Sequence, residues 1–153
     1  MERDLIVILE MFILAEIIIR DFREKIILNR SNLTLLFIGL YFGILNDDLW
    51  ARIIGSALYT LPFILIYTYG SDFFQKECLG LGDVKLMISI GTLLKFDNFF
   101  NVLLFINISF ISALIFIVIR YFIFKNIDKE IAFGPFLIFS YVLLKYGGVY
   151  VKF

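Results

Sequence analysis

Long apolar runs without any charged residue recur along this chain, and they constrain its fold more than any other feature. The run over residues 99–119 contains no Asp, Glu, Lys or Arg. A helix that crosses a membrane needs roughly 20 mostly apolar residues. Apolar residues make up 61% of the sequence, against about 45–50% in soluble domains. Because backbone polar groups must be satisfied internally in lipid, the sequence predicts an all-α, polytopic integral membrane helical bundle.

Six candidate transmembrane helices follow from these runs. The predicted spans cover residues 5–20, 33–45, 50–69, 84–94, 99–124 and 131–150. The second and fourth are shorter than a membrane is thick, so we expect either to be tilted, thinly embedded or buried among the others. Since no internal repeat or linker interrupts the pattern, residues 1–153 are expected to form a single membrane-embedded domain.

The distribution of Lys and Arg predicts the orientation, because these residues gather in cytoplasmic loops. Nine lie in or beside the loops after the first, third and fifth spans: Arg20, Arg23, Lys25, Arg30, Lys76, Lys85, Arg120, Lys125 and Lys129. Five lie on the opposite side: Arg3, Arg52, Lys95, Lys145 and Lys152. The richer side is therefore predicted to be cytoplasmic, with both termini outside. The expected location is the cell (inner or cytoplasmic) membrane.

Several kinds of chemistry are excluded by the residue types present. The sequence has no histidine, and Cys78 is its one cysteine. Histidine-dependent triads, the usual zinc sites, paired-cysteine metal sites and iron–sulfur clusters are therefore ruled out. Fourteen basic residues balance fourteen acidic ones, so nothing indicates a nucleic-acid surface. We expect no metal and no cofactor, which leaves carboxylates, Lys, Arg, Ser and Tyr as the reactive groups.

Asp21 and Asp83 lie at the predicted cytoplasmic margin, one after the first span and one before the fourth. Two neighbouring carboxylates do not both ionise readily, so one retains a proton. The charged one can then accept a proton from water while the protonated one polarises a peptide carbonyl. Gly80 and Gly82 precede Asp83 and permit a close backbone approach. These residues alone leave open a solvated helix end for Asp21 and a loop-to-helix hinge before Asp83.

Charged residues inside predicted spans usually face the interior of a bundle. Glu16 lies four residues before Arg20, which predicts an ion pair within one helix. Glu10 lacks such a neighbour, and Lys145 in the last span is its candidate partner. Structural roles are expected for both glutamates. Pro62 inside the third span is expected to kink that helix.

Three segments together resemble a known family. Residues 80–86, Gly-Leu-Gly-Asp-Val-Lys-Leu, resemble the second catalytic motif of the type IV prepilin leader peptidases, which are Gly-x-Gly-Asp aspartic proteases. Residues 21–29 resemble the first motif, an aspartate followed by a basic loop and Ile-Pro-Asn. Residues 131–136 resemble the Pro-Phe-Gly-Pro stretch that begins the last span. The matches occur in family order and extend from near residue 5 to near residue 145.

The resemblance implies the activity and its residues. It implies a membrane-embedded aspartic endopeptidase that cleaves the basic leader of prepilin or pseudopilin-like precursors on the cytoplasmic side, before a hydrophobic stem. Asp21 and Asp83 match the two catalytic aspartates. Further motif or near-site positions are Gly80, Gly82, Lys85, Gly134 and Pro135. Leu28 and Ala132 stand where the family usually or often has proline, and we expect altered loop geometry there, with activity retained.

Two further expectations follow from what the sequence contains. Many bacterial members carry an N-terminal extension with paired Cys-x-x-Cys motifs, associated with methylation of the new pilin N-terminus. No such segment precedes residues 5–20, so a short peptidase without methyltransferase activity is expected. The expected partners are the leader-bearing substrate and the lipid bilayer, with no nucleic acid. Alternatives are a preflagellin-type or other signal-peptide-cleaving protease of the same class, and a non-catalytic membrane subunit or cation-binding transporter.

Overall fold

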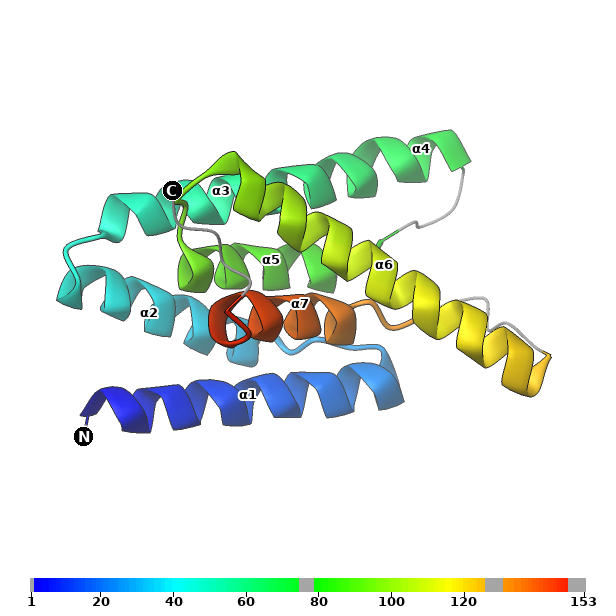
Figure 1. The fold of residues 1–153 in the computed structure, drawn as a ribbon, viewed down its shortest axis with the longest axis horizontal. Helices are drawn as coiled ribbons and strands as arrows, with labels where there is room; N and C mark the ends of the chain where they lie inside the picture. Colours follow the sequence, from blue (N-terminus) through cyan, green and yellow to red (C-terminus); the bar gives the residue numbers. More distant parts are fainter. Residues whose placement is uncertain (1, 75–78, 126–130, 149–153) are drawn as a thin grey trace.

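The computed structural model describes residues 2–74, 79–125 and 131–148, and these residues form an all-α bundle. The helices are α1 (Glu2–Glu24), α2 (Asn29–Leu45), α3 (Leu49–Leu65), α4 (Ser71–Phe74), α5 (Leu81–Leu94), α6 (Phe99–Phe124) and α7 (Gly134–Tyr146) (Figure 1). A π-helical turn, Ile66–Gly70, joins α3 to α4. Four residues discussed above lie outside the described residues: Lys76, Cys78, Lys129 and Lys152.

The helices confirm the all-α class and coincide closely with the predicted segments. The bounds of α6 equal those of the predicted fifth span. In contrast, α7 begins at Gly134, three residues later than predicted, because Pro135 lies in its first turn, where proline favours a helix start. Pro62 lies inside α3 as predicted, and the π-helical turn begins four residues after it.

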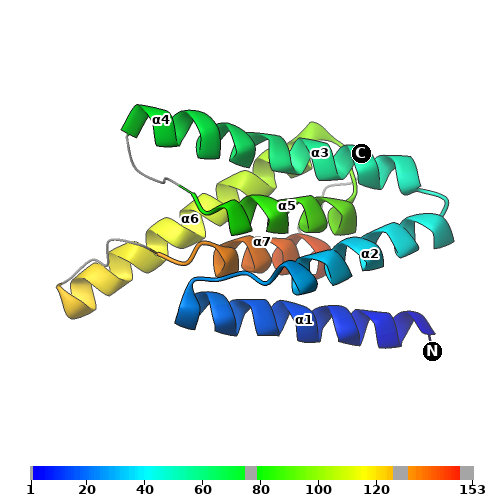
Figure 2. The same cartoon turned by 180° about the vertical axis from the view of Figure 1, so that it is seen from behind.

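The short helix α5 lies at the centre of the bundle. It packs against α3, α2 and α7, and ten of its fourteen residues are buried (Figures 1 and 2). The expectation that a short span is buried among the others is therefore confirmed for this helix. Contact with α3 is close because both helices present glycine. A Cβ atom at Gly55 would lie 2.7 Å from the carbonyl oxygen of Gly91.

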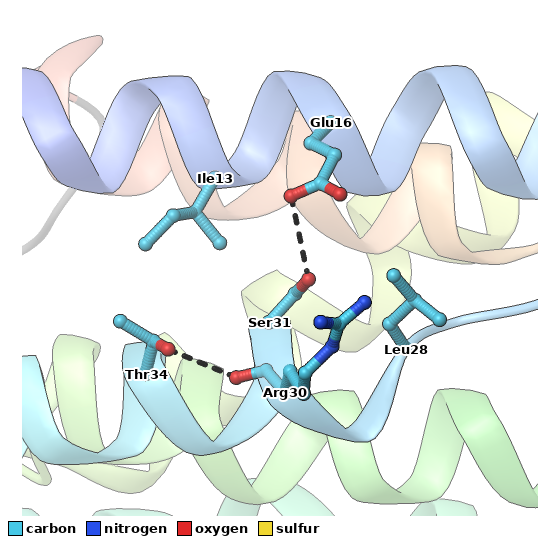
Figure 3. A pocket seen from close by; sticks show the side chains of 6 residues that line it. All are labelled: Ile13, Glu16, Leu28, Arg30, Ser31 and Thr34. Carbon is cyan, nitrogen blue, oxygen red and sulfur yellow. Dashed lines mark hydrogen bonds between the residues drawn. The ribbon is translucent and has the colours of Figure 1, made fainter.

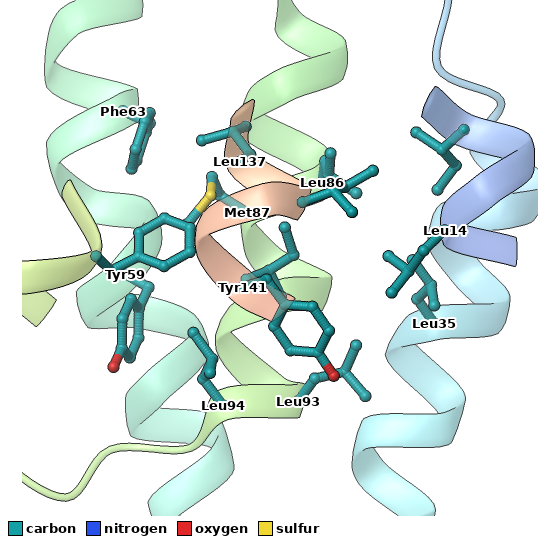
Figure 4. Close-up of a cluster of buried hydrophobic side chains, with 14 of the residues drawn as sticks. Leu14, Leu35, Tyr59, Phe63, Leu86, Met87, Leu93, Leu94, Leu137 and Tyr141 are labelled. Carbon is teal, nitrogen blue, oxygen red and sulfur yellow. The ribbon is translucent and has the colours of Figure 1, made fainter. Parts of the chain in front are cut away.

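Large apolar side chains from five helices meet around α5. Tyr59 and Phe63 of α3 extend the cluster towards α6, where the ring of Phe105 lies 5.5 Å from that of Tyr59. The fully buried members drawn in Figure 4 include Leu14, Leu35, Tyr59, Phe63, Leu86, Met87, Leu137 and Tyr141. This core fixes the positions of α5 and α7, whose first residues belong to the motifs described above.

The outer surface of the bundle is rich in large apolar side chains. Phe12, Trp50 and Phe122 are each more than 70% exposed, and many other Ile, Leu and Phe side chains are exposed on α1, α2, α3 and α6. Soluble monomers rarely expose apolar patches on this scale. Two helical segments, Leu49–Gly70 and Phe99–Ile123, are long and apolar enough to cross a membrane. Embedding of the other helices stays a prediction.

Candidate active site

Asp21 lies in the last turn of α1, with its side chain only 4% exposed. Its Oδ2 atom accepts a hydrogen bond from the backbone N–H of Gly134, with a nitrogen–oxygen distance of 3.0 Å. Gly134 is the first residue of α7, and the N-terminus of a helix favours negative charge. Burial raises the pKa of the Asp21 carboxyl above 3.8, and the Gly134 hydrogen bond acts in the opposite direction.

Asp83 is the third residue of α5, and its side chain is 8% exposed. Gly80 precedes the helix as its N-cap in an extended conformation, with φ −74° and ψ 141°. A backbone hydrogen bond at Gly80 stabilises the charged form of the Asp83 carboxyl, as acidic residues at the third helical position often do. Burial, followed by the charge of Asp21, outweighs it and raises the pKa of Asp83 to about 7.

The charge of Asp21 acts on Asp83, so the two buried carboxyl groups from α1 and α5 lie within electrostatic range of each other. A coupled pair of this kind loses its protons in two steps that belong to the pair. The negative charge of either group disfavours ionisation of the other. Such a pair is a candidate for a general acid and a general base.

Ile27, in the loop between α1 and α2, lies between the two glycine-containing segments. A Cβ atom at Gly82 would lie 3.4 Å from Ile27 Cβ, and one at Gly134 would lie 3.2 Å from Ile27 Cδ1. Lys85 Nζ donates a hydrogen bond to Asn29 Oδ1 at 3.2 Å. The three segments singled out in the sequence, residues 21–29, 80–86 and 131–136, therefore meet at one end of the bundle.

Two glycines leave room for the carboxylates to lie against the backbone. A Cβ atom at Gly134 would lie 2.6 Å from Asp21 Oδ2, closer than real Cβ contacts occur. A Cβ atom at Gly80 would lie 3.1 Å from Asp83 Oδ2. Pro135 is buried in the first turn of α7, where its fixed φ suits the start of a helix. A larger residue at either position would displace the carboxylate, by more at Gly134 than at Gly80.

The sequence-predicted residues divide into two groups in the structure. Asp21, Asp83, Gly80, Gly82 and Gly134 come together, whereas the exposed side chain of Lys85 contacts Asn29 and contacts neither aspartate. Sequence reasoning did not identify Ile27 or the amide of Gly134 as parts of the site. Ile27 lies inside the first motif, directly before Leu28, where the family usually has proline. Its place in that motif was the feature of the sequence that could have indicated its role.

A groove between α1 and α2 lies beside this region. It is lined by Ile13, Glu16, Leu28, Arg30, Ser31 and Thr34 (Figure 3). Glu16 points across it towards Ser31 Oγ, which lies 3.5 Å from Glu16 Oε2, and it also pairs with Arg20 at 3.1 Å as predicted. Neither aspartate lines the groove, so it is separate from the carboxyl pair. Within the described parts of the chain, no three His, Cys, Asp or Glu side chains gather where they could hold a metal ion.

Comparison with known protein families identifies a match over most of the chain. The model of the type IV leader peptidase family matches residues 7–119, well over half of the 153-residue chain. The matched region contains both Asp21 and Asp83 and ends before α7. No curated protein and no solved structure matches.

Proposed function

The chain belongs to the type IV leader peptidase family, and from this premise we propose that it is a membrane-embedded aspartic endopeptidase. It cleaves the basic leader from prepilin or pseudopilin-like precursors at the cytoplasmic face of the membrane. Asp21 and Asp83 activate the attacking water. The family is membrane-bound and of the aspartic type, and its substrates are of the prepilin type in general. The cytoplasmic assignment rests on the Lys and Arg distribution, since four of these residues lie at positions 20–30 around Asp21.

The observation that carries the proposal is the electrostatic coupling of two buried carboxyl groups at the same end of the bundle. A pKa of about 7 for Asp83 means that this group retains a proton on about half of the molecules at neutral pH. The simplest alternative is that the two aspartates are solvated helix ends without a catalytic role. Such residues would be exposed, and their pKa would be close to the usual value. Carboxyl pairs with separated roles are typical of acid–base catalysis.

The two carboxyl groups take different roles in the proposed mechanism. The Gly134 N–H and the N-terminus of α7 favour the ionised form of Asp21. Asp21 therefore removes a proton from water, whose oxygen attacks the scissile carbonyl carbon, while Asp83 donates its proton to the carbonyl oxygen. The resulting diol collapses as Asp21 returns a proton to the departing amine nitrogen and Asp83 recovers its own. The carbon–nitrogen bond breaks, and both groups regain their initial states.

The test is cleavage of a prepilin peptide by the purified protein in detergent. Asp21→Asn and Asp83→Asn are each expected to lower kcat by about 10³-fold or more, since each removes one acid–base function. Asp72→Asn is the matched control, because Asp72 is an exposed aspartate of α4, and its activity is expected to equal that of the wild type. Full activity in either catalytic variant would exclude the mechanism. A wild-type protein that cleaves no prepilin-type peptide would exclude the function.

A further inference from the structure

A second polar cluster joins the middle of α1 to the C-terminal part of α7, away from the aspartates. Glu10 of α1 is 0% exposed, and Lys145 Nζ lies 2.9 and 3.0 Å from its two carboxylate oxygens. The hydroxyl group of Tyr141 donates to Glu10 Oε1, and the hydroxyl group of Tyr146 lies 3.5 Å from the same atom. The pairing of Glu10 with Lys145 confirms the partner predicted from the sequence. The proposed peptide hydrolysis uses none of these groups.

The cluster holds Lys145 from several directions. Its ammonium group lies 5.1–5.9 Å from the ring centroids of Phe42, Tyr141 and Tyr146, within the range of cation–π attraction. Arg52 of α3 lies within electrostatic range as a like charge and repels the ammonium group, so the attraction comes from Glu10 and the rings. A buried charge away from its partner is costly in an apolar environment. The cluster therefore favours one relative position of α1 and α7 over positions shifted along the helix axis.

The spacing connects this cluster with the aspartate site. Glu10 and Asp21 are eleven residues apart on α1, and Gly134 and Lys145 are eleven residues apart on α7. At 1.5 Å per residue, each interval spans about 16 Å. The two helices run antiparallel. A single register along their axes therefore forms both contacts at once, Glu10 with Lys145 and Asp21 Oδ2 with the Gly134 N–H. The apolar side chains between these contacts distinguish less sharply between neighbouring registers.

We propose that Glu10, Lys145 and Tyr141 are positioning residues, which set α1 against α7 so that the Asp21 carboxylate meets the Gly134 N–H. The inference rests on the proposed peptidase function, because positioning matters through the acid–base role of Asp21. Loss of the cluster lets α1 slide on α7. The Asp21 carboxylate then loses the hydrogen bond that favours its charged form, and a higher pH is needed to ionise the base.

The decisive comparison is Glu10→Leu against Glu10→Gln. Both substitutions remove the same negative charge, so the direct field of Glu10 on Asp21 changes equally in the two. Gln keeps an oxygen that accepts hydrogen bonds from Tyr141 and Lys145, whereas Leu does not. The other charged groups around Asp21 stay unchanged: Asp83 of α5 across the site, and Arg20, Glu24 and Lys25 on its own segment.

The expected result is a shift of the acid limb of the kcat profile. Its midpoint should lie about one pH unit higher in Glu10→Leu than in Glu10→Gln, which is the effect of one lost hydrogen bond to a carboxylate. At pH values below both midpoints, we expect kcat of Glu10→Leu to be about a tenth of that of Glu10→Gln, with KM unchanged. Coincident acid limbs in the two variants would overturn the proposal, because a purely structural cluster changes the amount of folded protein and leaves the pH profile in place.

A second variant covers the case in which Glu10→Leu leaves Lys145 unpaired and the protein does not fold. Glu10→Leu/Lys145→Met preserves the net charge, and well-packed apolar replacements of a buried ion pair are commonly tolerated. We expect the midpoint of the acid limb to lie higher than in the wild type by the same amount. An acid limb at the wild-type position would contradict the proposed positioning role. Lys95→Met is the matched control. Lys95 directly follows α5 as its C-cap and pairs with Asp48 and Asp97 at 3.5 Å, outside the contact between α1 and α7.

A readout independent of catalysis separates the two proposals. The carboxyl carbon of Asp21 can be titrated by ¹³C NMR in labelled protein, with Asp21→Asn identifying its signal. If the wild type cleaves no prepilin peptide, the proposed function fails, and the NMR midpoints of Glu10→Leu and Glu10→Gln still decide the positioning. A midpoint about one pH unit higher in Glu10→Leu supports it, and equal midpoints refute it.

Discussion

The Asp21 carboxylate accepts a hydrogen bond from the backbone N–H of Gly134 at 3.0 Å, although 113 residues separate the two in sequence. The contact joins the end of α1 to the beginning of α7 and places the carboxylate at a helix N-terminus. It also explains the residue type at position 134. A side chain there would occupy the space that Asp21 Oδ2 now fills.

Gly134→Ala is expected to lower kcat by about 10²-fold, since the added Cβ would lie 2.6 Å from Asp21 Oδ2 and must displace the carboxylate. Cleavage of a prepilin peptide measures the effect. Phe139→Ala is the control, because Phe139 lies on the exposed face of the same helix, and it should retain wild-type activity. A Gly134→Ala enzyme with wild-type kcat would show that the carboxylate does not need its present position.

The rate of cleavage is expected to fall as the pH rises through about 7. Burial and the charge of Asp21 raise the pKa of Asp83 to about 7, and its proposed role as the acid requires the protonated form. Above this pH the protonated fraction falls about tenfold per pH unit. The measurement is kcat between pH 5 and 9, with a peptide whose residues around the cleaved bond do not ionise in this range. A rate that is constant from pH 7 to 9 would assign the proton to another group.

The folded state is expected to lose stability as the pH rises from 3.8 to about 7. Asp83 in the unfolded chain has a pKa near 3.8, and folding raises it to about 7. The folded state therefore binds a proton that the unfolded chain does not, and stability is fully present below pH 3.8 and declines as the pH rises to about 7. We expect Tm in detergent to be about 5 °C lower at pH 8 than at pH 5. Asp83→Asn should reduce this decline, and an equal decline in that variant would contradict the assignment.

The helices of this fold could be predicted because apolar length is a local property of the sequence. The start of α6 and most of its length follow from the uncharged run over residues 99–119. The central position of α5 was among the outcomes expected of a span too short to cross a membrane. The ion pair of Glu10 and Lys145 could also be predicted from the sequence, because a charge inside a membrane span needs an opposite charge at a similar depth.

The remaining parts of the site depend on contacts between distant segments. Asp21 and Asp83 were identifiable from their motifs, but the Gly134 N–H is a backbone group and leaves no mark in the sequence beyond its small residue type. Ile27 is one apolar residue among many, and its place between Gly82 and Gly134 depends on how three helix ends meet. Tyr141 likewise resembles any aromatic residue of a membrane helix until its hydroxyl group is seen to donate to Glu10.

Gly91→Ala is expected to destabilise the bundle by about 2 kcal/mol. The added Cβ would lie 2.7 Å from both the carbonyl oxygen of Gly55 and the Cα of Ser56, and backbone atoms cannot yield as a flexible side chain does. Thermal unfolding in detergent measures the change. Ala57→Leu enlarges an exposed side chain of α3, the helix that Gly91 of α5 contacts, and should leave Tm within about 1 °C of the wild type. Equal Tm values in both variants would show that α3 and α5 are not in close contact at Gly91.

Leu28→Pro is expected to stabilise the protein by about 0.4–1 kcal/mol, because proline restricts the unfolded chain at a position whose backbone already suits it. Leu28 precedes α2 as its N-cap with φ −69°, close to the −65° that proline imposes. Tm should rise by about 2 °C, and kcat should stay within about twofold of the wild type. Leu33→Pro is the contrasting variant, since it removes a backbone donor inside α2 and should cost about 3 kcal/mol. Leu28 also lines the groove beside the site, so a Leu28→Pro enzyme with a higher Tm and a much lower kcat would mean that its side chain serves catalysis.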